Sequence, residues 1–347
     1  MTKPTLLAAL TLLLASALPL AAQDVPPDVL DTAYVPGAYR VFTGAGTPAS
    51  LDDIVAAMAR HQVVFVGETH DDPTGHMLEA TLLERAYAAY SAERPVVLSL
   101  EFFERDVQLV MDEYLAGLIS ERMFLKDSRP STRYESDYRP LIEFAKERGL
   151  AVLAANAPRR YVSRVATHGR EALDGLSAGA REYLPPLPYG QPSDAYRRQW
   201  IQEISELMEQ EGTKCGVPLP ALEGGQDTVT AQASMSPHGS MGNQMHSQVL
   251  WDATMAHSIA RALSAEPRTL VLHVVGGFHV QYGTGTPEHL AAYRPGTSFL
   301  IVLMRPVESV DTFEPAPEGA WGDYVIQTDQ TRTLEAIECR EYLAGRE

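Results

Sequence analysis

The chain has 347 residues, of which 45% are hydrophobic and 21% are charged, a composition typical of a globular protein. Its formal net charge of -17 argues against a nucleic-acid-binding protein, because contacts to phosphates need a basic surface. The length fits one large α/β domain or two smaller ones and does not decide between them.

The first 22 residues have the pattern of a secretory signal peptide. A lysine near the start is followed by an apolar stretch from Leu6 to Leu14 and then by small residues up to Ala22. The apolar stretch is short for a membrane span, which needs about 20 residues. There is no cysteine near the cleavage region that could carry a lipid. We therefore expect residues 1–22 to be removed and a single domain, residues 23–347, to be secreted or periplasmic.

The predicted elements alternate between helices and strands. Residues 23–50 are rich in Pro, Gly and Asp and predict an extended opening segment, and residues 51–60 predict a helix capped by Ser50. Predicted strands follow at VVFVG (63–67), VVLSLE (96–101), AVLAAN (151–156), LVLHVVGG (270–277), FLIVLM (299–304) and, more weakly, DYVIQ (323–327). Predicted helices lie between them at residues 77–90, 141–148 and 249–263. Because unbroken apolar runs suit strands buried on both faces, this order predicts a three-layer α/β fold with a mainly parallel sheet sandwiched by helices.

Two intervals are too long for simple crossovers between strands. Residues 102–140 and 160–247 predict helical insertions that cover one end of the sheet as a helical subdomain. Within the second, residues 212–242 are rich in Gly, Pro, Ser and Thr and predict a mobile segment. Cys215 and Cys339 could pair in an oxidising compartment, or each could be a free buried cysteine.

Polar side chains follow four of the predicted strands. They are Glu68 and His70 after the first strand, Glu101 after the second, Asn156 and Arg159 after the third, and His279 after the fourth. The carboxyl ends of parallel strands lie on one edge of a sheet, and α/β proteins bind ligands there. We therefore expect these residues to form one pocket.

The residue types in this pocket fit two kinds of ligand. Histidine and carboxylate without thiolate suit a divalent Fe, Mn, Co or Zn ion held by Glu68, His70, Glu101 and His279. With Glu68 or Glu101 as base, such an ion could activate water for hydrolysis of a peptide or ester bond. Alternatively, Arg159 and the histidines could hold an anionic ligand.

Structural explanations for the same residues stay open at this point. Glu68 could form a purely structural bridge with Arg159, and Asp71 and Asp72 could serve the helix that follows them. His273 lies inside a predicted strand and is expected to be a satisfied core histidine.

The segment SMSPHGSMGNQMHSQ (234–248) has a methionine- and histidine-rich composition. It could bind a soft metal, or it could be a linker whose methionines dock on the body of the protein. Its His246 is the residue expected to reach the main pocket. Asp252, further along, could cap a helix or reach the same pocket, and His76 lies near a helix start.

Several motifs together resemble one family. They are GETHDD, VVLSLEFF, YRPLIEFAKERGLAVLAANAPRR, QVLWDATMAHSIARAL and HVVGGFHVQYGTG, spread in order from about Val63 to Gly285. This set is similar to the ChaN-like haem-binding proteins, the DUF399 family, which is related to erythromycin esterase-like and Tiki-like proteins. The resemblance implies a three-layer α/β fold, a role in haem or iron uptake, and haem held at a dimer interface through Tyr and His. It also points to relatives that are metal-dependent hydrolases.

Carried over by motif, the resemblance marks Gly67, Glu68, His70, Glu101 and His279 as site residues, together with Asn156 and Arg159. The tyrosine that would ligate haem does not map to one position. Tyr282 and Tyr138 are the candidates. Either could instead be an ordinary packed tyrosine with a polar hydroxyl and no role in haem binding. The implied partners are haem or another small molecule, a second copy of the chain and outer-membrane uptake proteins. The sequence therefore predicts an exported haem- or iron-binding protein, with a metal-dependent periplasmic hydrolase as the alternative.

Overall fold

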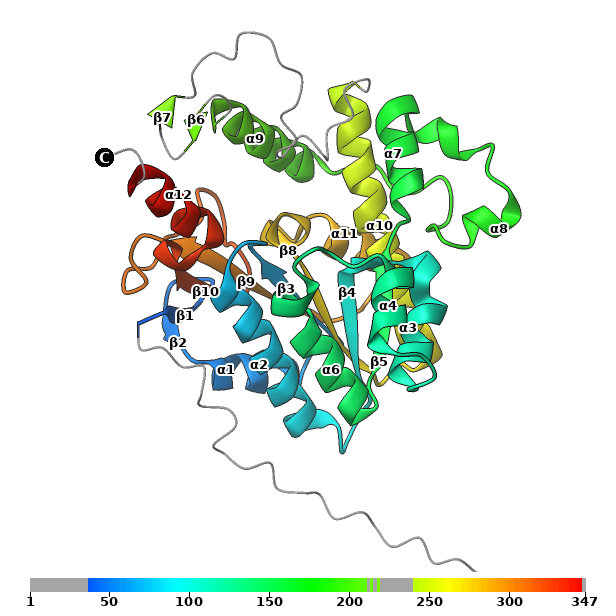
Figure 1. The fold of residues 1–347 in the computed structure, drawn as a ribbon, viewed down its shortest axis with the longest axis horizontal. Coiled ribbons are helices and arrows are strands. Elements are labelled where there is room, and N and C mark those ends of the chain that lie inside the picture. Colours follow the sequence, from blue (N-terminus) through cyan, green and yellow to red (C-terminus); the bar gives the residue numbers. More distant parts are fainter. Residues whose placement is uncertain (1–36, 211–212, 215–216, 219–239, 345–347) are drawn as a thin grey trace, which may run out of the picture. The chain divides into compact units, whose positions relative to one another are not determined.

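The computed structural model describes residues 37–210, 213–214, 217–218 and 240–344 (Figure 1). Within them, eight strands form one sheet in the order β2-β1-β10-β9-β3-β8-β4-β5. The strands are β1 (Tyr39–Thr43), β2 (Pro48–Ala49), β3 (Val63–Glu68), β4 (Val96–Glu104), β5 (Ala151–Asn156), β8 (Leu270–Gly276), β9 (Phe299–Val307) and β10 (Tyr324–Asp329). The six strands from β10 to β5 are parallel, and β1 is antiparallel to both of its neighbours. The predicted α/β fold with a mainly parallel sheet is confirmed.

Helices cover both faces of this sheet, as Figure 1 shows. One face carries α1 (Leu51–Met58), α2 (Pro73–Tyr90) and α6 (Arg139–Arg148), and the other carries α10 (Met241–Ala265) and α11 (Thr286–Tyr293). Side chains of β3 belong to the apolar cores on both faces of the sheet, because alternate side chains of a strand point to opposite faces. Val64 and Val66 pack with α1 and α2, whereas Val63 and Phe65 pack with α10.

The other elements fill the two long intervals and the end of the chain. They are α3 (Gln108–Leu115), α4 (Glu121–Ser128), α5 (Tyr134–Asp137), α7 (Arg159–His168), α8 (Ala178–Arg181), α9 (Asp194–Gln210), the short strands β6 (Thr213–Lys214) and β7 (Val217–Pro218), α12 (Leu334–Ala344), and the 3-10 turns η2 (Arg105–Val107), η3 (Arg170–Leu173), η5 (Gly277–His279), η6 (Gln281–Gly283) and η7 (Gln330–Arg332). Side chains of α7, α9 and α10 share a third apolar cluster. None of the described helices has the length and the apolar character that a membrane crossing requires.

The largest differences from the sequence prediction lie at the edges. The opening segment, predicted as extended chain, contains the antiparallel strands β1 and β2, which were too short to stand out as apolar runs. Helix α10 starts at Met241 instead of residue 249, because Ser240 caps it by accepting a hydrogen bond from the Asn243 amide. Within the second insertion, Arg170–Leu173 form the short 3-10 helix η3. Much of the segment predicted to be mobile, residues 219–239, lies outside the described residues.

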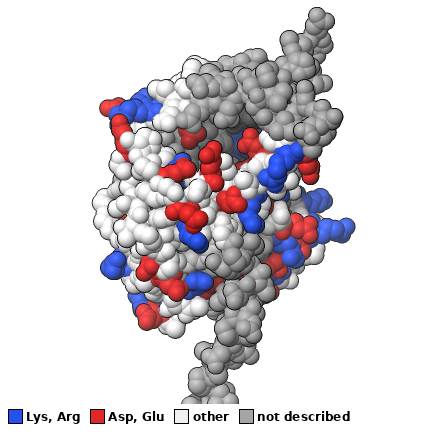
Figure 2. Space-filling view, turned by 90° about the vertical axis from the view of Figure 1, so that its left-hand side faces the viewer, with Lys and Arg blue, Asp and Glu red and all other residues white. Residues whose placement is uncertain are grey.

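Charged groups on the face drawn in Figure 2 are intermixed, with acidic and basic side chains next to one another.

Cys339 of α12 is disulfide-bonded, and Cys215 lies outside the described residues. Asp72, which the sequence assigned to a helix start, is the N-cap of α2 and accepts a hydrogen bond from the Thr74 amide at 3.0 Å.

Candidate functional site

The site is built where β3 and β8 end and where β4, which continues to Glu104, stops pairing with β8 after Leu100. Strands β3, β8 and β4 lie side by side in that order, so Glu68, the turn after β8 and Glu101 come to one edge of the sheet. Gly276 joins them, because its amide donates a hydrogen bond to Glu101 Oε2 at 2.7 Å. The absence of a side chain on Gly276 leaves room for His70, since a Cβ there would lie 3.2 Å from His70 Nε2.

His279 is buried in η5 and held from one side by helix α10. Its Nδ1 lies 2.8 Å from Asp252 Oδ1, and its Nε2 faces Glu101 Oε1 at 3.6 Å. Asp252 also accepts hydrogen bonds from the hydroxyls of Tyr196 and Thr286, at 2.8 and 2.9 Å. Burial alone would lower the pKa of His279, but the charges of Asp252 and Glu101 raise it to about 9.

Unlike His279, His70 is exposed to solvent, but it also has a carboxylate partner. Its side chain is 59% exposed, and its Nδ1 lies 2.6 Å from Oε1 of the buried Glu68. The hydrogen bond to Glu68 raises the pKa of His70, and the charge of Glu101 raises it further. Each of the two histidines therefore has its Nδ1 fixed by a carboxylate, which leaves Nε2 to act as a metal ligand or in proton transfer.

Behind His70 lies a buried cluster of Glu68, His76 and Glu79. Nδ1 of His76 is 3.4 Å from Glu68 Oε2 and 3.3 Å from Glu79 Oε2, and its Nε2 is 3.1 Å from the His70 carbonyl oxygen. Tyr138 donates a hydrogen bond to Glu68 Oε1 at 3.0 Å. Within the described part of the chain, Glu68, His76 and Glu79 form a group compact enough to hold a metal ion, with ligand atoms within 4.8 Å of one another.

The electrostatics of this cluster are unusual for a protein interior. Burial raises the pKa of Glu79, and the neighbouring Glu68 raises it further. Burial would also raise the pKa of Glu68, but hydrogen bonds from His70 and His76 outweigh it and lower that pKa. Burial alone would lower the pKa of His76. Glu68 and Glu79 outweigh burial and raise this pKa to about 11. Among the described residues, no donor has good hydrogen-bond geometry to Glu68 Oε2, which His76 Nδ1 approaches to 3.4 Å, or to Glu79 Oε1, so both oxygens could coordinate a bound cation.

Two of the predicted pocket residues lie at the end of β5 and just after it, at the border of the sheet. Asn156 is buried, and its Oδ1 accepts a hydrogen bond from the Ala157 amide at 2.8 Å. Arg159 is exposed at the start of α7. The predicted structural bridge between Glu68 and Arg159 is not formed. Glu68 instead contacts His70, His76 and Tyr138.

The two candidate haem tyrosines have different surroundings. Tyr138 is buried with its hydroxyl on Glu68, and its ring stacks on Phe102 with centroids 3.9 Å apart. The ring of Tyr282 lies against Trp321, with centroids 5.0 Å apart.

The remaining histidines also differ from expectation. His246 lies near the start of α10, where its nearest charged neighbours are Arg170, Arg197 and Glu171 rather than the carboxylates of the site. Met235 and His238 of the same segment lie outside the described residues. His273 is in the core as predicted, but only its Nδ1 is hydrogen-bonded, to Ser99 Oγ at 2.9 Å, and its buried Nε2 has no described partner.

Sequence reasoning missed Glu79 entirely and gave His76 and Asp252 minor roles. The sequence did contain a signal for His76 and Glu79. They are three residues apart in a predicted helix, so their side chains lie on the same helix face. Asp252 interrupts an apolar stretch of α10, and a buried acid in such a stretch needs a partner. Tyr196 lies in a helix of the second insertion, and nothing in the local sequence connects it to the site.

Comparison with known proteins identifies the family and a similar fold. The family model described as "Haem-binding uptake, Tiki superfamily, ChaN" matches residues 54–290, more than half of the chain. The chain belongs to the ChaN family. A structure titled "Cofacial heme binding to ChaN of Campylobacter jejuni" is similar in fold, with a TM-score of 0.57, 14% identity, and coverage of 83% of this chain and 96% of that one.

Two further proteins are similar to this ChaN-family chain over much of its length. Protein RETICULATA-RELATED 5, chloroplastic, of Arabidopsis thaliana is 26% identical over 257 residues, which are 71% of this chain. That match covers only 31% of the plant protein. A mutant of the erythromycin esterase EreC in its open conformation has a TM-score of 0.40 and 11% identity, with coverage of 84% of this chain and 83% of that one.

The pair of Asp252 and His279 predicts a pH-dependent contribution to stability. The folded-state pKa of His279, about 9, exceeds its ordinary value, so the contribution is fully present below about pH 6.5 and is lost as the pH rises through 9. We expect Asp252→Asn to lower the free energy of unfolding by roughly 1–3 kcal/mol at pH 6, and by less at pH 9.5. Urea unfolding at both values measures this. Asp127→Asn, an exposed acid, is the control, and a loss of equal size at both pH values for Asp252→Asn would contradict the assignment.

Proposed function

We propose that this ChaN-family protein is exported and binds haem for haem or iron uptake, with His70 as an iron ligand. The observation that carries the proposal is the exposed imidazole of His70, whose Nδ1 is fixed by a buried carboxylate. A carboxylate on one nitrogen orients the ring and makes the other nitrogen a better ligand. Bound haem would supply an iron atom that accepts such an imidazole as an axial ligand.

The surroundings of His70 are compatible with a flat apolar ligand. The half-buried ring of Phe102 meets the ring of His70 edge to face, with centroids 5.9 Å apart, and Tyr138 supports Phe102 from behind. The similar protein of Campylobacter jejuni is described as binding haem cofacially, which supports haem as the ligand proposed here. A homodimer is part of the proposal. Transfer to or from outer-membrane uptake proteins is part of the proposal.

A metal-dependent hydrolase is the second candidate, and the buried cluster favours it. Glu68, His76 and Glu79 could hold a divalent Fe, Mn, Co or Zn ion with nitrogen and oxygen ligands. The three side chains are almost inaccessible to solvent, and the nearby side chains of His279 and Glu101 are only 8% and 12% exposed. In this candidate Glu101 would act as the base, and His279, polarised by Asp252, would donate or accept the proton.

Replacement of His70 tests the haem proposal. Addition of haem to the purified protein is expected to produce a Soret band distinct from that of free haem, and His70→Ala is expected to abolish it. His168→Ala, an exposed histidine on α7, is the matched control. An unchanged spectrum of free haem in the wild-type titration would exclude the proposal.

The pH dependence of haem affinity gives a sharper form of the same test. Iron and a proton compete for His70, whose pKa the hydrogen bond to Glu68 raises. Haem affinity should therefore fall as the pH decreases through this raised pKa, and Glu68→Gln should move the midpoint to lower pH. Spectroscopic titrations between pH 5 and pH 9 measure both midpoints. Equal midpoints in the two proteins would show that Glu68 does not tune His70.

Replacement of Glu79 tests the metal candidate. We expect the dialysed wild-type protein to retain a stoichiometric divalent ion, and Glu79→Gln to weaken its binding by about tenfold or more, because it removes an anionic ligand. Glu84→Gln on the same helix is the control. Elemental analysis and melting temperatures with added Zn, Mn or Co provide the measurements. Absence of metal from the wild type, with melting temperatures insensitive to these ions, would leave the cluster as a structural ion network.

A further inference from the structure

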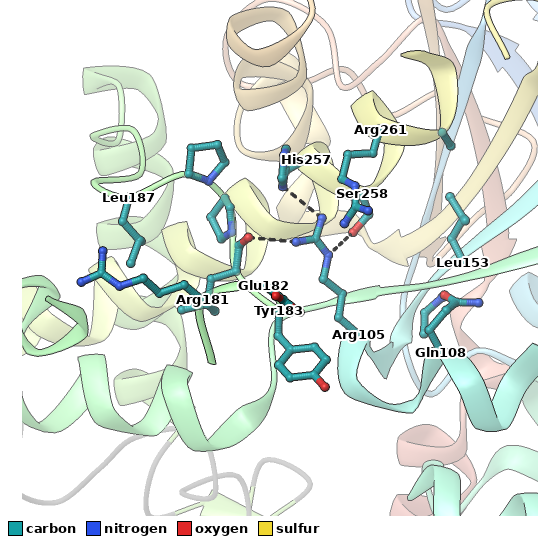
Figure 3. A pocket seen from close by; sticks show the side chains of 15 residues that line it. Arg105, Gln108, Leu153, Arg181, Glu182, Tyr183, Leu187, His257, Ser258 and Arg261 are labelled. Atoms are coloured by element: carbon teal, nitrogen blue, oxygen red, sulfur yellow. Dashed lines mark hydrogen bonds between the residues drawn. The ribbon is translucent and has the colours of Figure 1, made fainter. Parts of the chain in front are cut away.

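A cleft of about 970 Å³ lies away from the strand-end site, between β5, α10, the turn η2 and the segment that follows α8 (Figure 3). It shares no lining residue with the histidine and carboxylate site described above. Three arginines, Arg105, Arg181 and Arg261, line it together with a single acidic residue, Glu182. For a chain with a net charge of -17, this is a local reversal of charge.

The central cation of the cleft is Arg105, of which only 9% is exposed. Its guanidinium is held in place by neutral groups: Nε donates to Ser258 Oγ at 2.8 Å, and Nη1 donates to the Leu184 carbonyl oxygen at 3.0 Å. Nη2 lies 3.1 Å from Nδ1 of His257. Figure 3 shows the guanidinium between His257 and Ser258 of α10.

Arg105 has no acidic partner in the part of the chain that the structure describes. No carboxylate lies within ion-pair distance of it there, and no carboxylate contributes to its pKa. Burial and the neighbouring Arg261 lower that pKa to about 10, so the guanidinium still carries its charge at neutral pH. A buried charge is normally paired, because removal from water costs several kcal/mol. The two outer guanidinium nitrogens each retain hydrogens beyond the contacts described, so an anion could bind there.

The residues next to Arg105 strengthen the preference for an anion. Arg261 is exposed at the rim of the cleft and has no ion pair within the described ranges. Burial and the two arginines lower the pKa of His257 to about 4, so its ring is neutral at pH 7. Since Nδ1 of His257 accepts from the Arg105 guanidinium, the proton of the neutral ring is on Nε2, where it can be donated.

Part of the lining of the cleft is apolar. Leu184, Pro185, Pro186 and Leu187 come from the segment after α8, where the Leu184 carbonyl contacts Arg105, and Leu153 comes from β5. Such a lining offers nothing to a small hydrated anion but stabilises a hydrocarbon body by burial.

We propose that this cleft is a second binding site, specific for an amphipathic anion in which a carboxylate or phosphate head group pairs with Arg105 and Arg261 and an apolar body lies on the leucine and proline side chains. The proposal does not depend on haem binding at His70.

Calorimetric titration with defined probes tests the site. Laurate and dodecyl phosphate are expected to bind saturably to one site per chain, and the tighter of the two identifies the head group. Inorganic phosphate and the neutral detergent dodecyl maltoside are expected to bind at least about tenfold more weakly, a difference of about 1.4 kcal/mol. Equal affinity for the neutral detergent, or no saturable binding of either amphipathic anion, would overturn the proposal.

Two variants locate the binding. Arg261→Gln is expected to weaken the tighter probe about tenfold, whereas Arg60→Gln, an exposed arginine outside the cleft, should not. Ala262→Phe places a ring in the cleft and should also weaken binding, with the melting temperature of each variant reporting whether it folds. His70→Ala should bind the probe as the wild type does. If His70→Ala alone reduced the affinity, the binding would belong to the haem site instead.

Discussion

The buried carboxylate of Glu68 is the interaction on which the functional edge of this protein depends. It ends the central strand β3 and receives His70, His76 and Tyr138 from three directions. An ionised carboxylate in the interior is stable only when donors surround it. Here these donors come from the loop after β3, from helix α2 and from Tyr138, which lies between α5 and α6. The same contacts therefore fix the exposed imidazole, the start of the following helix and the packing of the first insertion against the sheet.

A second carboxylate repeats this arrangement on the other side of the sheet. Asp252 of α10 orients His279 in the way that Glu68 orients His70. The negative charge of Glu101 raises the pKa of both imidazoles. One histidine is exposed and the other is buried, so they suit different tasks. The exposed ring can reach a large ligand, whereas the buried ring can hold a proton or respond to charge at the edge.

The sequence predicted the sheet well because its signals are local. Unbroken apolar runs mark strands buried on both faces, and the residues that follow them, Glu68, His70, Glu101 and His279, were expected to converge once the strands were taken as parallel. The antiparallel strands β1 and β2 escaped because two to five residues carry little periodicity. Partners contributed by helices, such as Glu79, Asp252 and Tyr196, depend on helix rotation and packing, which no single segment encodes. The orientation of Tyr138 and Tyr282 is likewise set by rings that are distant in sequence.

Helix α10 connects the two regions that carry chemistry. Asp252 projects from it toward His279, and less than two turns later His257 and Ser258 hold Arg105 in the cleft. A rigid helix transmits a shift or rotation at one of these points to the other. If occupancy of either region alters the position of α10, then each ligand must change the affinity of the other by the same factor, since binding free energies are reciprocal. One helix therefore carries groups of both regions, and any coupling between their ligands would act through it.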